Sequence, residues 1–95
     1  MNGNARFEWD DTKAAANLLK HGIRFELAAS VFLDEAVVHL DVSRAIDAEA
    51  RRKAIGIVEG RLFTVVYTLR GGVIRVISLR RANTKERRAY EAVYP

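Results

Sequence analysis

Cations crowd the last third of this sequence, in a pattern that suits a partner bearing phosphate groups. Residues 80–91, RRANTKERRAYE, hold five Lys/Arg and two Asp/Glu residues. Arginine matches phosphate oxygens with a rigid fork of donors and stays charged at neutral pH. A solvated basic helix would have the same composition, so this stretch alone leaves both interpretations open.

RNA cleavage is a reaction that such residues can carry, because RNA supplies its own nucleophile, the 2′-hydroxyl beside the scissile phosphate. A protein has to align the two groups, neutralise charge on the phosphate oxygens and move two protons. Arg80 suits the charge, and His21 suits the protons because imidazole titrates near neutral pH. Glu86 and Tyr90 are further candidates for proton transfer. Each residue also has a possible structural role: Arg80 could be an exposed strand-edge residue, and His21 a cation at the end of a helix. Glu86 also fits a helix cap, and Tyr90 fits a core position.

Other reaction classes lack the residues they need. Cysteine is absent, which excludes disulfides, thiolate nucleophiles and cysteine-ligated zinc. His21 and His39 do not have the spacing of metal ligands, and no glycine-rich phosphate loop lies between a strand and a helix. We therefore predict that the chain holds no metal and needs no cofactor.

Composition predicts a single domain over residues 1–95 and a polyanionic or acidic partner. Ninety-five residues with 49% hydrophobic content can bury one core. Residues 1–50 carry five basic and nine acidic side chains, a net of −4, whereas residues 51–95 carry eleven and three, a net of +8. A basic half favours nucleic acid or an acidic protein, although cations also keep exposed sheet edges soluble. No secretory pattern or membrane-spanning run is evident, so a cytoplasmic location is expected.

Two short helices are predicted after an initial strand at FEWD, residues 7–10. In residues 12–22, Ala15, Leu18 and Leu19 form the expected apolar stripe, with Lys13, Asn17 and Lys20 on another face. Gly22 suits the residue after the helix. Phe25, Ala28, Ala29 and Phe32 then recur at helical spacing and predict the second helix.

The strongest structural signal is a run of strands from residue 52 to residue 81, after a strand at AVVHLD and a polar loop. Glu59-Gly60 and Gly71-Gly72 are suited to tight hairpins, which predicts an antiparallel meander. With a two-residue turn at Gly71-Gly72, Tyr67 pairs with Val76, Val65 with Ser78 and Phe63 with Arg80. Gly56 pairs with Phe63 by the same reasoning.

The C-terminal helix is predicted to start near Thr84, because Asn83 and Glu86 have the spacing of a capping box. Glu86, Ala89, Tyr90 and Val93 share one face of it. The expected order is β-α-α-β-β-β-β-α. This order predicts an α+β fold, with two N-terminal helices and one C-terminal helix packed on one side of the sheet.

Residues 7–28, FEWDDTKAAANLLKHGIRFELA, resemble the opening of the BrnT toxins. The shared pattern is F-E-W-D, then Lys13, Asn17 and Lys20-His21-Gly22, then F-E. The segments AIG (54–56), VVYT (65–68) and IRVISLRRANTKERRAYE (74–91) match as well, so the resemblance covers about nine-tenths of the chain. One departure is Glu49-Ala50-Arg51-Arg52, where family members often have E-E-R followed by an aromatic residue.

The resemblance implies the toxin of a type II toxin–antitoxin pair: a RelE-like, metal-independent endoribonuclease that arrests translation. Its substrate would be RNA, free or on the ribosome. Its partner would be a BrnA-type antitoxin with a ribbon-helix-helix domain, which alone contacts operator DNA. The positions matching the pattern are Lys20, His21, Arg51, Arg80, Arg81, Glu86 and Tyr90.

Two function classes compete at this point. In the leading hypothesis Arg80, His21, Glu86 and Tyr90 are catalytic, and the RNA-binding residues are Lys20, Arg51, Lys53, Arg81, Lys85 and Arg88. The alternative is a non-catalytic module whose basic surface binds an acidic antitoxin segment and serves operon repression. Direct DNA binding by this chain is weaker, because no helix-turn-helix spacing is evident.

Overall fold

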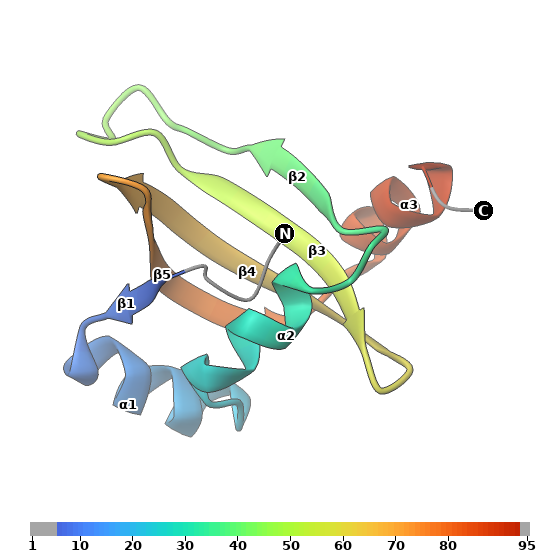
Figure 1. The fold of residues 1–95 in the computed structure, drawn as a ribbon, viewed down its shortest axis with the longest axis horizontal. Helices are drawn as coiled ribbons and strands as arrows, with labels where there is room; N and C mark the ends of the chain where they lie inside the picture. Colours follow the sequence, from blue (N-terminus) through green and yellow to red (C-terminus); the bar gives the residue numbers. More distant parts are fainter. Residues whose placement is uncertain (1–5, 94–95) are drawn as a thin grey trace.

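The predicted order of elements is confirmed by the computed structural model, which describes residues 6–93 (Figure 1). The elements are β1 (Phe7–Trp9), α1 (Asp11–His21), the 3₁₀ turn η1 (Phe25–Leu27), α2 (Ala28–Phe32), β2 (Val38–Asp41), β3 (Arg52–Val58), β4 (Arg61–Arg70), β5 (Val73–Arg81) and α3 (Thr84–Val93). Residues 1–5 and 94–95 of the predicted 1–95 domain lie outside this description. No helix between residues 6 and 93 is long and apolar enough to cross a membrane.

The five strands form one sheet in the order β1-β5-β4-β3-β2. Strands β2 to β5 are the predicted antiparallel meander, and both hairpins turn where expected. Glu59 and Gly60 have φ of 50° and 78°, and Gly71 and Gly72 have 55° and 81°. These positive φ angles are typical of two-residue hairpin turns. The prediction of a purely antiparallel sheet was incomplete, because β1 pairs with β5 in parallel.

The helices lie on both faces of the sheet, so the prediction of one helical side was wrong. Phe25 and Phe32, from η1 and α2, pack with Ala54, Phe63 and Val65 in the main core. The neighbouring strand residues point the other way, where Val38, Ile55 and Leu62 pack with Tyr90 of α3. Figure 1 shows α2 in front of the sheet and α3 behind it. The alternation of side chains along β3 and β4 therefore builds two cores, one on each face.

The inward face of α1 consists of Ala14 and the polar Asn17 and not of the predicted apolar stripe, which was wrong. Leu18 and Leu19 are exposed, Leu19 to 90%, and Asn17 is buried. The Asn17 side-chain amide donates to the Leu79 carbonyl at 2.8 Å and accepts from the Leu79 N–H at 3.1 Å. It also donates to the carbonyl of Ile23. The strand β1 pairs only with residues 74–76 of β5. Beyond them, the Asn17 amide therefore forms the hydrogen bonds to the β5 backbone that a longer β1 would have formed.

A register shift in β5 decides which way the last strand residues point. Tyr67 pairs with Val76, and Gly56 with Phe63, as predicted. Val66 then pairs with Ser78, because β5 contains one extra residue at this point. The predicted pairs Val65–Ser78 and Phe63–Arg80 were therefore wrong: Phe63 pairs with Arg81, and Thr64 with Arg80. A one-residue shift exchanges the two faces, so Arg80 lies on the α3 side and Arg81 on the α1 side.

Replacing Asn17 by Ala should destabilise the protein by roughly 2–3 kcal/mol, because it leaves the buried N–H and carbonyl of Leu79 without partners. Urea unfolding monitored by circular dichroism measures this change. Leu19→Ala on the same helix is the control and should change stability little, because Leu19 is exposed. Equal stability of the two variants would contradict the role assigned to the amide.

Candidate active site

The predicted capping box at the start of α3 is confirmed and complete. The Asn83 side chain accepts a hydrogen bond from the Glu86 N–H at 2.8 Å. The Glu86 side chain accepts one from the Asn83 N–H at 2.9 Å. This exchange fixes the Glu86 carboxylate against the sheet, where it is only 1% exposed.

Three strands supply further donors to the Glu86 carboxylate. Arg80 of β5 makes a two-pronged ion pair with it, with Nη1–Oε1 at 2.7 Å and Nη2–Oε2 at 2.8 Å. Lys53 of β3 donates from Nζ at 3.0 Å, and Thr64 of β4 donates from Oγ1 at 2.9 Å. We call Lys53, Thr64, Arg80 and Glu86 the Glu86 cluster. It carries two cations and one anion, a net charge of +1.

The Glu86 carboxylate is held in its charged form. Burial alone would raise its pKa, but the hydrogen bonds from Arg80, the Asn83 N–H, Lys53 and Thr64 outweigh burial and hold the pKa far below its usual range. The same ion pair raises the pKa of Arg80. A carboxylate with such a low pKa and so many donors is unsuited to exchanging protons near neutral pH. Its geometry suits a positioning role instead.

Arg80 remains accessible although its position is fixed. Its side chain is 30% exposed, and that of Lys53 is 19% exposed. Arginine has five N–H donors, and the ion pair with Glu86 uses one on each terminal nitrogen. Nη1 also donates to the Arg81 carbonyl at 3.4 Å. The donors that remain leave this guanidinium able to bind an anion arriving at the sheet surface.

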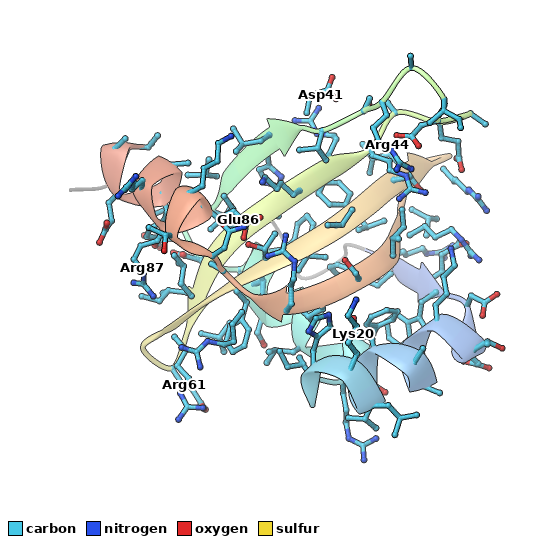
Figure 2. The ribbon with its side chains drawn as sticks, turned by 180° about the vertical axis from the view of Figure 1, so that it is seen from behind. Lys20, Asp41, Arg44, Arg61, Glu86 and Arg87 are labelled. Atoms are coloured by element: carbon cyan, nitrogen blue, oxygen red, sulfur yellow. The ribbon has the colours of Figure 1, made fainter. Side chains whose placement is uncertain are left out.

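The sheet face around this cluster is largely uncovered by helices, since α3 packs against only part of β2 and β3. Figure 2 views the molecule from this side, with Glu86 between α3 and the strands and with Arg44 in the loop before β3. We call this surface the open face. Three of its arginines have acidic partners: Arg51 pairs with Asp47, Arg70 with Glu49 and Arg75 with Glu8. Arg51, Arg70 and Arg75 line a shallow hollow beside Thr68 and Ile77.

His21 and Arg81 lie on the opposite face, so the structure does not bring His21 together with Arg80. They line a cavity of about 710 Å³, together with Leu18, Ile23, Arg24, Glu26, Leu27, Arg61 and Phe63. We call it the α1-side pocket. The Arg81 guanidinium lies 5.6 Å from the centre of the Phe63 ring, a cation–π contact. The register shift in β5 is the cause of this separation.

Tyr90 anchors α3 to the rest of the fold. Its hydroxyl donates to Asp34 Oδ2 at 2.7 Å, and its ring lies in the second core with Ile55 and Leu62. Asp34 also accepts from the Ile57 and Ala36 N–H groups. Burial raises the pKa of Asp34, but the hydrogen bonds from Tyr90 and these two N–H groups outweigh it, and the net shift is downward. These contacts give Tyr90 a structural role.

The remaining RNA-binding candidates are exposed side chains: Lys20, Lys85 and Arg88. Lys20 lies near the end of α1, beside the β5 edge of the sheet in Figure 2. Lys85 and Arg88 lie on α3. None of the three forms an ion pair with any residue between 6 and 93.

Sequence reasoning missed two contributions. Thr64 sits in an apolar strand, where its hydroxyl gave no functional signal, although a threonine among buried residues requires a partner. A second polar group joins His39 to Tyr67, with Nδ1 and the hydroxyl 2.7 Å apart. Burial and the nearby Arg52 lower the pKa of His39.

In the described part of the chain, no three His, Asp or Glu side chains are grouped so that they could hold a metal ion.

Comparison with protein families identifies the family of this chain. The sequence model of a family described as the ribonuclease toxin BrnT of type II toxin–antitoxin systems matches residues 9–86. This range includes every member of the Glu86 cluster and every residue that lines the α1-side pocket. No curated protein matches the chain.

Replacing Glu86 by Gln should lower stability at pH 7 by roughly 2–3 kcal/mol, because Arg80 and Lys53 lose their anion while still reaching solvent. It should also flatten the dependence of stability on pH. The folded-state pKa of Glu86 lies below the unfolded value, so its contribution is complete above about pH 4.3 and is lost as the pH falls toward the folded pKa.

Urea unfolding at several pH values between 7 and 3 measures both effects. The wild-type protein should lose stability more steeply than Glu86→Gln below about pH 4.3. Glu91→Gln, at an exposed position of the same helix, should follow the wild type. Parallel curves for wild type and Glu86→Gln would show that the carboxylate is not held charged in the folded protein.

Proposed function

Because this chain belongs to the BrnT family of ribonuclease toxins of type II toxin–antitoxin systems, we propose that it is an endoribonuclease that cleaves RNA at the Glu86 cluster, using the 2′-hydroxyl of the substrate and no metal ion. The family implies an RNA substrate and an antitoxin partner. The proposal extends this to a BrnA-type antitoxin, which alone contacts operator DNA, and to translation arrest in the cytoplasm through loss of RNA. It also assigns a RelE-like fold, which the meander sheet with helices on its faces supports.

The observation that carries the proposal is the fixed fork of Arg80. Its guanidinium is oriented by two hydrogen bonds to a buried carboxylate, and it remains partly exposed on the open face. A donor already in place when charge develops stabilises a transition state without reorganising. Glu86 is thus the positioning residue, and Arg80 the residue that contacts the reacting phosphate.

The reaction follows from RNA chemistry. The 2′-oxygen attacks phosphorus, the bond from phosphorus to the 5′-oxygen breaks, and a 2′,3′-cyclic phosphate and a 5′-hydroxyl are formed. The 2′-hydroxyl loses one proton to solvent and the leaving 5′-oxygen gains one. Arg80 and Lys53 neutralise the phosphorane oxygens between these events. Arg51 and the exposed Lys85 and Arg88 attract the RNA backbone by charge.

His21 and Arg81 take no part in this reaction in our proposal, because the sheet separates them from Arg80. Tyr90 acts through the placement of α3 and its capping box, since its hydroxyl is bonded to Asp34. None of the three sequence-based candidates for proton transfer, His21, Glu86 and Tyr90, therefore transfers a proton in this proposal.

Arg80→Ala should lower the rate of RNA cleavage by roughly 100-fold or more, which is the effect of removing one oriented donor from a developing oxyanion. Arg80→Lys should recover only part of the rate, because an ammonium group cannot form the two-pronged pair with Glu86. Arg87→Ala is the matched control, since Arg87 is exposed on α3. Cleavage of a labelled RNA by purified protein, followed in gels, measures all three.

His21→Ala should retain most of the activity, and EDTA should not slow the wild-type protein. Loss of cleavage in His21→Ala together with retention in Arg80→Ala would move the reaction to the α1-side pocket. Inhibition by EDTA that added Mg²⁺ reverses would refute metal-independent cleavage. RNA binding without cleavage over varied substrates would favour a non-catalytic module.

A further inference from the structure

We propose that the α1-side pocket is the anchoring surface for the antitoxin, and that it takes a segment in which carboxylates stand beside an apolar side chain. The inference rests on the proposed function in one respect, that the bound antitoxin restrains the nuclease. In this proposal the residues that line the α1-side pocket, and not those of the Glu86 cluster, provide the affinity for the antitoxin.

The first argument is the contrast in charge pairing between the two faces. The cations that the strands and the loop before β3 place on the open face already have acidic partners, at Glu86, Asp47, Glu49 and Glu8. The cations on that side without an ion pair to a residue between 6 and 93 belong to helices: Lys13 of α1, and Lys85 and Arg88 of α3. On the α1-side pocket, Arg24, Arg61 and Arg81 have no ion pair with any residue between 6 and 93. Among the described lining residues, Glu26 is the one acid. Three exposed guanidinium groups around a single cavity create a field that favours carboxylates.

The second argument is the apolar content of the same surface. The pocket is lined by Leu18, Ile23, Leu27 and Phe63 among its cations. Leu19, the next residue of α1, is 90% exposed. Exposed leucines beside arginines are typical of protein interfaces. A single RNA strand instead needs open aromatic rings for stacking, and Phe63 is 8% exposed with Arg81 lying over its ring.

The position of the pocket explains how anchoring can restrain the nuclease. Arg81 lines the pocket, and Arg80, the preceding residue of β5, belongs to the Glu86 cluster on the other face. A segment held by Arg24 and Arg61 therefore needs only to continue around the end of β5 to reach Arg80. The anchor provides affinity, and the continuing chain covers the reaction face.

The double variant Arg24→Glu/Arg61→Glu tests the proposal, because both side chains are exposed and neither belongs to the Glu86 cluster. Isothermal titration uses as the ligand a purified ribbon-helix-helix antitoxin that binds the wild-type protein. We expect affinity to fall roughly tenfold or more through like-charge repulsion, while cleavage of labelled RNA stays unchanged. Arg87→Glu, a single charge reversal at an exposed site of α3, should leave both readings unchanged.

Unchanged antitoxin affinity in the double variant overturns the proposal. Unchanged affinity with reduced RNA cleavage overturns it and assigns the pocket to RNA. An equal loss of affinity in Arg87→Glu also overturns it, because the effect would then reflect net charge alone. The binding reading does not depend on cleavage, so a protein that cleaves no RNA would refute the proposed function and still test this surface.

Discussion

The buried carboxylate of Glu86 is the interaction on which the arrangement of the rest depends. A charge removed from water is tolerated only when hydrogen bonds replace its hydration. Here the replacements come from three strands and from the backbone at the start of α3. Satisfying this one group therefore fixes the register of β3, β4 and β5 relative to α3. The same bonds leave the Arg80 guanidinium oriented at the sheet surface. The hydrogen bonds that stabilise the buried carboxylate therefore also hold Arg80 in position at the candidate site.

The extra residue in β5 divides the chemistry of the C-terminal half between two faces. Arg80 and Arg81 are adjacent in sequence, yet one belongs to an ion cluster and the other lies over Phe63 across the sheet. Asn17 supports this arrangement from the free edge of β5 by bonding both backbone groups of Leu79. A regular strand with an apolar α1 would place the same residues differently. The extra residue in β5 and the buried amide of Asn17 together determine which face Arg80 and Arg81 occupy.

The two faces differ in how their cations are compensated, and in our proposals this difference gives them different partners. On the open face, paired cations are held rigid and add little net charge, which suits a site that must present a fixed donor to a phosphate. On the α1 side, uncompensated arginines beside exposed leucines suit an acidic, partly apolar protein segment. If both proposals hold, one small domain keeps catalysis and restraint on separate surfaces that meet at the end of β5.

The sequence by itself determined the features that depend on near neighbours: the order of the elements, both glycine-containing turns, the Asn83–Glu86 capping box and the family. Arg80, Lys53 and Glu86 were recognised, but not that Glu86 binds both cations. Only the tertiary structure decided the faces. One extra residue in β5 reverses every side chain beyond it, and no local pattern marks that residue. The inward position of Asn17 depended likewise on a strand edge 62 residues away, where the buried N–H and carbonyl of Leu79 need hydrogen-bond partners.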